Sequence, residues 1–131
     1  MANKELAGRV GLAASTVHAR LARLVETGAL RGFHADVDLE RLGFGIQAMV
    51  RIQLREQGTG LGELAERLLA LPQVLELYHV SGSEDLLLRV AARDTRSLRD
   101  LVVERLLEAG EARHVETSIV FEHLRSSALP E

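Results

Sequence analysis

Residues 46–55, IQAMVRIQLR, have the most regular pattern in the chain. Aliphatic side chains stand at every second position, and they alternate with Gln47, Met49, Arg51, Gln53 and Arg55. Successive side chains of a β-strand point to opposite faces, so this period of two predicts a strand that turns one face toward a core. The residues on either side of this strand indicate the kind of sheet it joins.

The next 40 or so residues switch to a helical pattern and then back to strands. Residues 61–68 have apolar side chains at helical spacing, and Pro72 prevents the helix from continuing. Two short strands are predicted at residues 74–80 and 86–92, with a hairpin turn at residues 81–85 between them.

A second helix and a last strand complete the predicted domain. The helix has its apolar positions at Leu98, Leu101, Val102 and Leu106. Asp94 or Ser97 is its expected N-cap, Gly110 follows its end, and a strand alternates from Val115 to Phe121. The order strand–helix–strand–strand–helix–strand predicts an α+β, ferredoxin-like βαββαβ domain. Two helices on one face leave the other face of the sheet to be covered, and a second copy in a homodimer is the simplest cover.

The residues before this domain predict a helix, a turn and a second helix. The apolar positions of the two helices recur every three or four residues: Leu6 and Val10, then Val17, Leu21 and Leu24. Asn3 is the expected N-cap of the first helix and Gly11 its end, while Gly28 ends the second helix.

The chain is expected to have two parts joined by a linker. Residues 29–35 are predicted to be a short extended segment, and residues 36–45, which contain Gly43 and Gly45, are the predicted hinge. The expected divisions are a helix-turn-helix region at 1–35, a linker at 36–45 and a sensing and oligomerisation domain at 46–131.

Composition restricts the class of protein. The 131 residues are 47% hydrophobic, which is enough to fill a core, and they contain no cysteine for a disulfide or a thiolate nucleophile. Purely apolar runs are four residues or shorter, and the N-terminus lacks the apolar region of a signal peptide. These features predict a cytoplasmic protein with no membrane partner.

The charges are divided unevenly along the chain. Residues 1–35 carry five basic and two acidic side chains, a net charge of +3, whereas residues 36–131 carry 11 basic and 17 acidic ones, a net charge of −6. A polyanionic partner would therefore meet the first region, although ordinary scatter of surface charge explains the difference equally well.

The second helix of the first region has the composition of a DNA-reading helix. With its aliphatic residues turned inward, Thr16, Ala19, Arg20 and Arg23 are expected to form an exposed stripe. The two arginines suit guanine edges or phosphates, Ser15 and Thr16 suit contacts near the positive helix N-terminus, and small Ala19 permits close approach to the major groove. Arg9 and Arg31 are expected to hold phosphates. The alternative is an amphipathic helix with a solvated polar face.

These segments resemble the Lrp/AsnC, or feast/famine, family of transcriptional regulators. The resemblance in the first region lies in ELAGRVGL at 5–12, STVHARLARL at 15–24 and TGAL at 27–30. In the second region it lies in LPQV at 71–74, HVSGSEDLLL at 79–88 and VETSIV at 115–120. It implies a regulator that binds double-stranded DNA as a homodimer, with further assembly to a tetramer or octamer. It also implies an amino acid or related small metabolite as effector, bound between neighbouring dimers.

The chain departs from the family pattern in two places. The family has another helix before the one that begins near Asn3, so a helix-turn-helix that lacks its first helix is expected here, unless the start codon has been placed too late. Leu6, Val10, Leu21 and Leu24 would then lack a packing surface. In addition, Ala13 stands where the family has a capping serine.

The resemblance also suggests where an effector binds. Gly82 and Asp85 fill the family's Gly-x-x-Asp turn, with Ser83 between them, and Thr117 and Ser118 are expected to supply hydroxyls beside it. Backbone groups at a glycine turn can hold a carboxylate, and Asp85 can accept hydrogen bonds from an ammonium group. The alternative is a tight turn with no ligand, built from the residues that turns favour.

No enzyme or metal motif is recognisable in the sequence. The five histidines lack metal-ligand spacing, and neither a phosphate-binding loop nor a nucleophile elbow is present, so no cofactor is expected.

Two other functions remain open: a stand-alone sensing or assembly module with a vestigial DNA-binding region, and an enzyme. Sirohaem decarboxylases resemble the same family, and His79 or His114 would then serve a tetrapyrrole.

Overall fold

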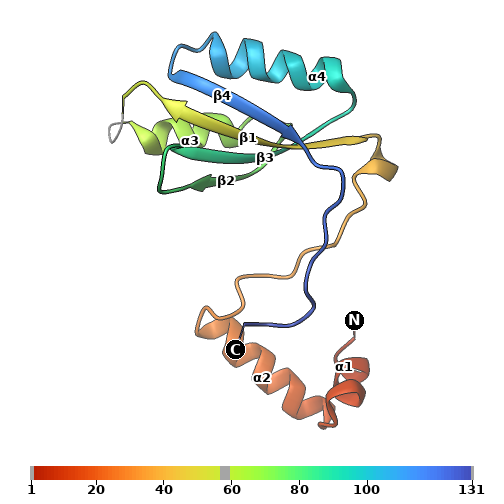
Figure 1. Cartoon of the computed structure of the whole chain (residues 1–131). Coiled ribbons are helices and arrows are strands. Elements are labelled where there is room, and N and C mark those ends of the chain that lie inside the picture. The colour runs from red at the N-terminus through yellow and green to blue at the C-terminus, as the bar shows by residue number, and fades with distance from the viewer. Residues whose placement is uncertain (1, 57–59, 131) are drawn as a thin grey trace. The chain divides into compact units, whose positions relative to one another are not determined.

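A computed structural model describes residues 2–56 and 60–130, which divide into two compact units (Figure 1). One unit extends to Val37 and the other starts at Asp38. Residues 38–45, within the predicted hinge, therefore belong to the second unit and contain a short 3₁₀ helix, η1, at Glu40–Leu42. Among the described residues, no helix is long and apolar enough to cross a bilayer.

The first unit consists of two helices, α1 at Asn3–Val10 and α2 at Ala14–Glu26. Gly11 ends α1 as predicted, since its φ of +71° lies in the left-handed region that glycine tolerates. The prediction that Asn3 caps α1 is wrong: the N-cap is Ala2, and Asn3 is already helical. The predicted extended segment at residues 29–35 is irregular, with no strand.

The second unit has the predicted order of elements. It contains β1 (Ile46–Leu54), α3 (Leu61–Leu69), β2 (Val74–His79), β3 (Leu86–Ala92), α4 (Thr95–Asp100), η2 (Leu101–Leu107) and β4 (Ala112–Ile119). All strand pairs are antiparallel, and the sheet order is β2-β3-β1-β4. This confirms the ferredoxin-like α+β fold.

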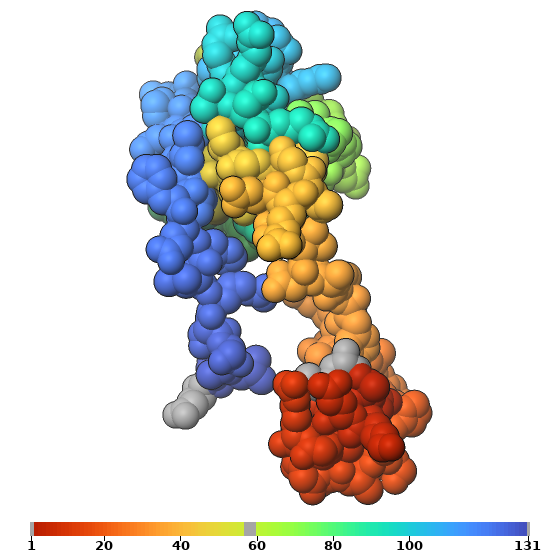
Figure 2. Space-filling model, turned by 90° about the vertical axis from the view of Figure 1, so that its right-hand side faces the viewer, coloured from red at the N-terminus to blue at the C-terminus, as the bar shows by residue number. Residues whose placement is uncertain are grey.

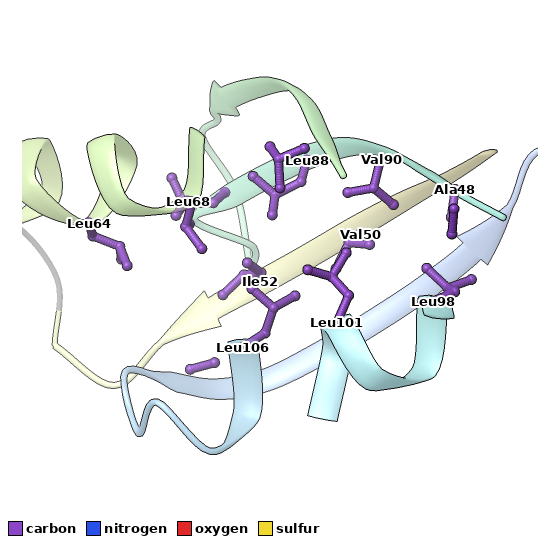
Figure 3. Close-up of a cluster of buried hydrophobic side chains, with 14 residues drawn as sticks. Ala48, Val50, Ile52, Leu64, Leu68, Leu88, Val90, Leu98, Leu101 and Leu106 are labelled. Carbon is purple, nitrogen blue, oxygen red and sulfur yellow. The ribbon is translucent and has the colours of Figure 1, made fainter. Parts of the chain in front are cut away.

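The core lies on one face of the sheet. Ala48, Val50 and Ile52 of β1 are buried there, and side chains from both helices of this unit belong to the same cluster (Figure 3). Leu64 and Leu68 come from α3, and Leu98, Leu101 and Leu106 from the α4–η2 helix. Both helices therefore cover the same face, and the opposite face carries Gln47, Met49, Arg51 and Gln53 of β1.

The structure selects one of the two predicted N-caps of α4 and corrects the predicted last helix and last strand. Asp94, not Ser97, caps α4: its carboxylate accepts a 2.8 Å hydrogen bond from the backbone N–H of Ser97, and this bond holds the pKa of Asp94 below its ordinary value. The helix continues as a π-helix, η2, instead of an α-helix. The last strand ends at Ile119, and Phe121, predicted to belong to it, is fully exposed. Figure 2 shows the C-terminal segment, in dark blue, extending away from the body of the second unit.

Candidate DNA-binding and ligand-binding sites

The polar face of α2 is held outward by a small apolar contact with α1. Ala7 of α1 and Val17 of α2 are both buried, and Leu21 is half-buried one turn further along α2. With these residues turned inward, Ala19, Arg20 and Arg23 are exposed on the other side, as predicted. Thr16 is a correction, because it is half-buried and does not stand in the exposed stripe.

The N-terminus of α2 has no side-chain cap. Its N-cap residue is Ala13, which has no side-chain oxygen, so the first backbone N–H groups of the helix have no partner of that kind. Exposed Ser15 and half-buried Thr16 lie within this first turn. Free N–H groups, hydroxyls and the positive end of the helix dipole together favour a phosphate.

The arginines of the first unit differ in their pairing. Arg9 lies 3.2 Å from Glu5 one turn earlier on α1, in an exposed ion pair. Arg20, Arg23 and Arg31 have no ion-pair partner within the described part of the chain. Unpaired guanidinium groups lose no internal contact when they move to an external anion, so these three are the more available for a nucleic acid.

The inner surface of the two helices is incompletely covered. Val10 and Leu24 are 54% and 42% exposed, although the sequence places both on the apolar side of their helices. This agrees with the expectation that they lack a packing surface within the residues described here.

The predicted effector turn is a hairpin fastened to β1. The backbone N–H of Val80 donates to the carbonyl of Asp85, and the N–H of Asp85 donates to the carbonyl of Ile52, both at 3.0 Å. One carboxylate oxygen of Asp85 accepts a 2.7 Å hydrogen bond from the N–H of Leu54. Gly82 has a φ of +110°, which suits glycine alone. The Asp85 carboxylate therefore helps to hold the hairpin against β1, in addition to any contact with a ligand.

Glu84 is a residue of this turn that the sequence reasoning missed. Its Oε2 atom is buried and has no hydrogen-bond partner among residues 2–56 and 60–130. A buried carboxylate oxygen without a partner is costly and marks a place where an outside donor is needed. Its position directly before Asp85 was the only signal in the sequence.

Thr117 and Ser118 do not lie beside this turn within one protomer. They stand opposite Val50 and Met49 on the β4 side of β1, whereas Asp85 is bonded to Ile52 and Leu54 from the β3 side. The Ser118 hydroxyl instead accepts a 3.0 Å hydrogen bond from Arg51. Within one protomer, β1 therefore separates Thr117 and Ser118 from the turn.

The uncovered face of the sheet carries a polar network that the sequence did not predict. Arg89 donates to Gln47 at 3.2 Å and lies 3.6 Å from Glu76. The hydroxyl of Tyr78 donates to the same carboxylate of Glu76 at 2.9 Å, and this carboxylate raises the pKa of Tyr78. These contacts connect side chains from β1, β2 and β3 across this face of the sheet.

His79 and His114, the two histidines considered for a tetrapyrrole, are both exposed. Within the described ranges, no group of three or more His, Asp or Glu side chains is arranged to hold a metal ion.

Comparison with known proteins gives matches to both units. Residues 47–129 match the Lrp/AsnC ligand binding domain, and residues 1–31 match a winged helix-turn-helix DNA-binding family. The transcriptional regulator AldR of Mycolicibacterium smegmatis is 41% identical over 127 residues, which are 96% of this chain and 74% of AldR.

Solved structures agree with these matches. A transcriptional regulator of Neisseria meningitidis in complex with L-methionine has a TM-score of 0.87 and 27% identity, over 99% of this chain and 85% of that one. A feast or famine regulatory protein of M. tuberculosis, also complexed with L-methionine, has a TM-score of 0.78 and 28% identity, over 96% and 84%. The chain therefore belongs to the Lrp/AsnC family of transcription regulators, with a helix-turn-helix DNA-binding segment and a ligand-binding domain.

Proposed function

We propose that this protein is a cytoplasmic, sequence-specific regulator that places α2 in the major groove of double-stranded DNA. The observation that carries this proposal is the exposed face of α2, where unpaired Arg20 and Arg23 follow a helix N-terminus without a side-chain cap. Arg20 and Arg23 contact base edges or phosphates, and Ala19 between them lets the helix approach the groove. Ser15 and Thr16 bind at the N-terminus of α2, and Arg9 and Arg31 hold phosphates.

A gel-shift titration with the promoter DNA upstream of its own gene tests this proposal. Because phosphate contacts release counterions, the association constant is expected to fall linearly with salt concentration on a double-logarithmic plot. Absence of binding at low salt contradicts the proposal and favours a sensing module without DNA-binding activity.

An amino acid or related small metabolite is the proposed effector, bound at the turn of residues 81–85 where copies of the chain meet. Gly82, Ser83 and Asp85 form the turn, and the unpartnered oxygen of Glu84 needs a donor such as an ammonium group. Thr117 and Ser118 contribute from a neighbouring copy, in keeping with their distance from the turn within one protomer. The two neighbours with L-methionine in their structures support this class of ligand.

Asp85→Asn is expected to weaken L-methionine binding about tenfold to a hundredfold, because a charge-assisted hydrogen bond contributes about 1.5–3 kcal/mol. Asparagine retains an oxygen that can accept from Leu54, so the hairpin is expected to remain folded. Isothermal titration calorimetry measures the change, with Asp100→Asn on the distant α4 as the control. Equal affinity in wild type and Asp85→Asn removes this residue from the proposed site.

The uncovered sheet face is the proposed homodimer interface, and further assembly to a tetramer or octamer builds on that dimer. Met49 and Leu87 stand on this face beside the Arg89 network, and a facing copy would exclude water from all of them.

Leu87→Lys is expected to shift the protein toward monomers in sedimentation velocity runs, because it buries an unpaired charge in the interface. Leu107→Lys, on the exposed side of η2, is the matched control and is expected to leave the dimer intact. A Leu87→Lys protein that sediments as wild type places the interface elsewhere.

A further inference from the structure

A cavity of about 260 Å³ lies on the helix side of the sheet, between α3 and η2. Its walls are mostly aliphatic and come from four elements: Ile52, Leu54, Leu64, Leu68, Leu106 and Ala112. Figure 3 shows several of these side chains, with Leu64 and Leu68 above β1 and Leu106 on the opposite helix. This space is many times larger than one water molecule needs, so it can admit a small ligand.

Charged side chains of both signs line the same cavity. Arg67 of α3 forms an ion pair with Glu111, which connects η2 to β4. Glu104 and Arg105 of η2 also line the cavity, and neither has an ion-pair partner in the described part of the chain. An aliphatic interior with one unpaired carboxylate and one unpaired guanidinium matches a ligand that has an apolar body and a zwitterionic end.

The helix that supplies these charges is not regular. Residues 101–107 form a π-helix where the sequence predicts an α-helix, and this segment places Glu104, Arg105 and Leu106 on the cavity. π-helical turns are uncommon and occur frequently at functional sites. The irregular helix is thus an observation independent of the cavity's size and composition.

We propose that this cavity is a second amino-acid site, contained within one protomer and specific for aliphatic side chains. The ligand's side chain lies among the leucines, its carboxylate pairs with Arg105 and its ammonium group pairs with Glu104. The proposal rests on the proposed amino-acid response but assigns it an additional site.

The cavity is connected to the turn of residues 81–85 through β1. Ile52 and Leu54 line the cavity with their side chains, and their backbone groups form the two hydrogen bonds to Asp85. Movement of this end of β1 when the cavity is filled therefore reaches the turn directly.

Methyl NMR of the full chain tests the proposal, with L-leucine as the probe. In wild type, the methyl resonances of Leu64, Leu68 and Leu106 are expected to shift and to saturate as L-leucine is added. Ala109→Phe places a ring at the mouth of the cavity, from an exposed position, and is expected to abolish these shifts. Arg105→Gln is expected to weaken them about tenfold or more through loss of the charged pair.

Two further variants distinguish this site from the turn. Arg99→Gln, an exposed arginine on the same helix but outside the cavity, is expected to match wild type. Asp85→Asn is expected to weaken L-methionine binding at the turn and to retain the cavity shifts.

Unshifted cavity methyls in wild type overturn the second site, and so does an Ala109→Phe protein that responds as wild type does. If the Gly82 amide still responds to L-methionine in either case, the turn site stands although the cavity site fails. If neither region responds to any aliphatic amino acid, both the second site and the proposed amino-acid response fail.

Discussion

Leu88→Ala is expected to lower the free energy of unfolding by about 2–5 kcal/mol, the range for removal of a large aliphatic side chain from a packed core. Leu88 is completely buried in β3, the strand that pairs with both β1 and β2. Its direct neighbours in the sheet are Val50 and Leu77, and both helices close the core above it. Its side chain has no exposed surface, so a value in the upper half of the range is expected.

Urea denaturation followed by circular dichroism measures this loss, with Leu107→Ala as the control. Leu107 has the same side chain but is 43% exposed on η2, and its replacement is expected to cost a small fraction of the Leu88 value. Similar losses for the two variants would show that Leu88 is not at the centre of the core.

Arg20→Ala is expected to weaken DNA binding by about 1–3 kcal/mol, or roughly fivefold to 150-fold, if its guanidinium reads a base edge. The side chain is exposed on α2 and forms no ion pair within the described residues, so the loss reflects contacts with DNA. If Arg20 contacts a base, its loss relaxes specificity at one position of the site. If Arg20 contacts a phosphate, its loss instead weakens binding to all sequences equally and lowers the slope of the salt dependence by about one.

Competition gel shifts against single-base variants of the operator separate these two roles. Arg113→Ala, an exposed arginine on β4 in the other unit, is the control and is expected to bind as wild type does. Unchanged affinity in Arg20→Ala removes this residue from the contact surface and transfers the proposed reading role to Arg23.

The regular elements of the second unit were predictable because their hydrophobic periods are unambiguous. Residues 46–55 alternate in the sequence, and the observed strand, Ile46–Leu54, ends one residue before Arg55. The ends of other elements depended on contacts that periodicity does not describe. Phe121 continues the alternation of β4, yet it is exposed because the strand pairs with β1 only as far as Ile119.

Caps show the same difference. Asp94 and Ser97 are both acceptable N-caps by residue type, and only the backbone geometry shows that the carboxylate of Asp94 accepts from Ser97. At Asn3 the side chain is of a capping type, but the helix begins one residue earlier than that role requires.

The candidate sites were predictable as local segments and not as assemblies. The turn of residues 81–85 and the arginines of α2 each lie in a short stretch, and their residue types predict their chemistry. The burial of Glu84 and the cavity beneath η2 arise from residues far apart in the chain, and no spacing rule connects Leu64 with Leu106.

The sequence by itself determined the βαββαβ order, the two-part division into a basic and an acidic region, and the family resemblance. These properties follow from local periodicity, turn chemistry and charge, which act between residues near one another in the chain. Only the tertiary structure decided the sheet order, the separation of Thr117 and Ser118 from Asp85, the π-helical geometry of residues 101–107 and the cavity beside them. The physical reason is that strand register and side-chain packing join residues distant in sequence, and the free energies of those contacts exceed the local preferences of any one segment.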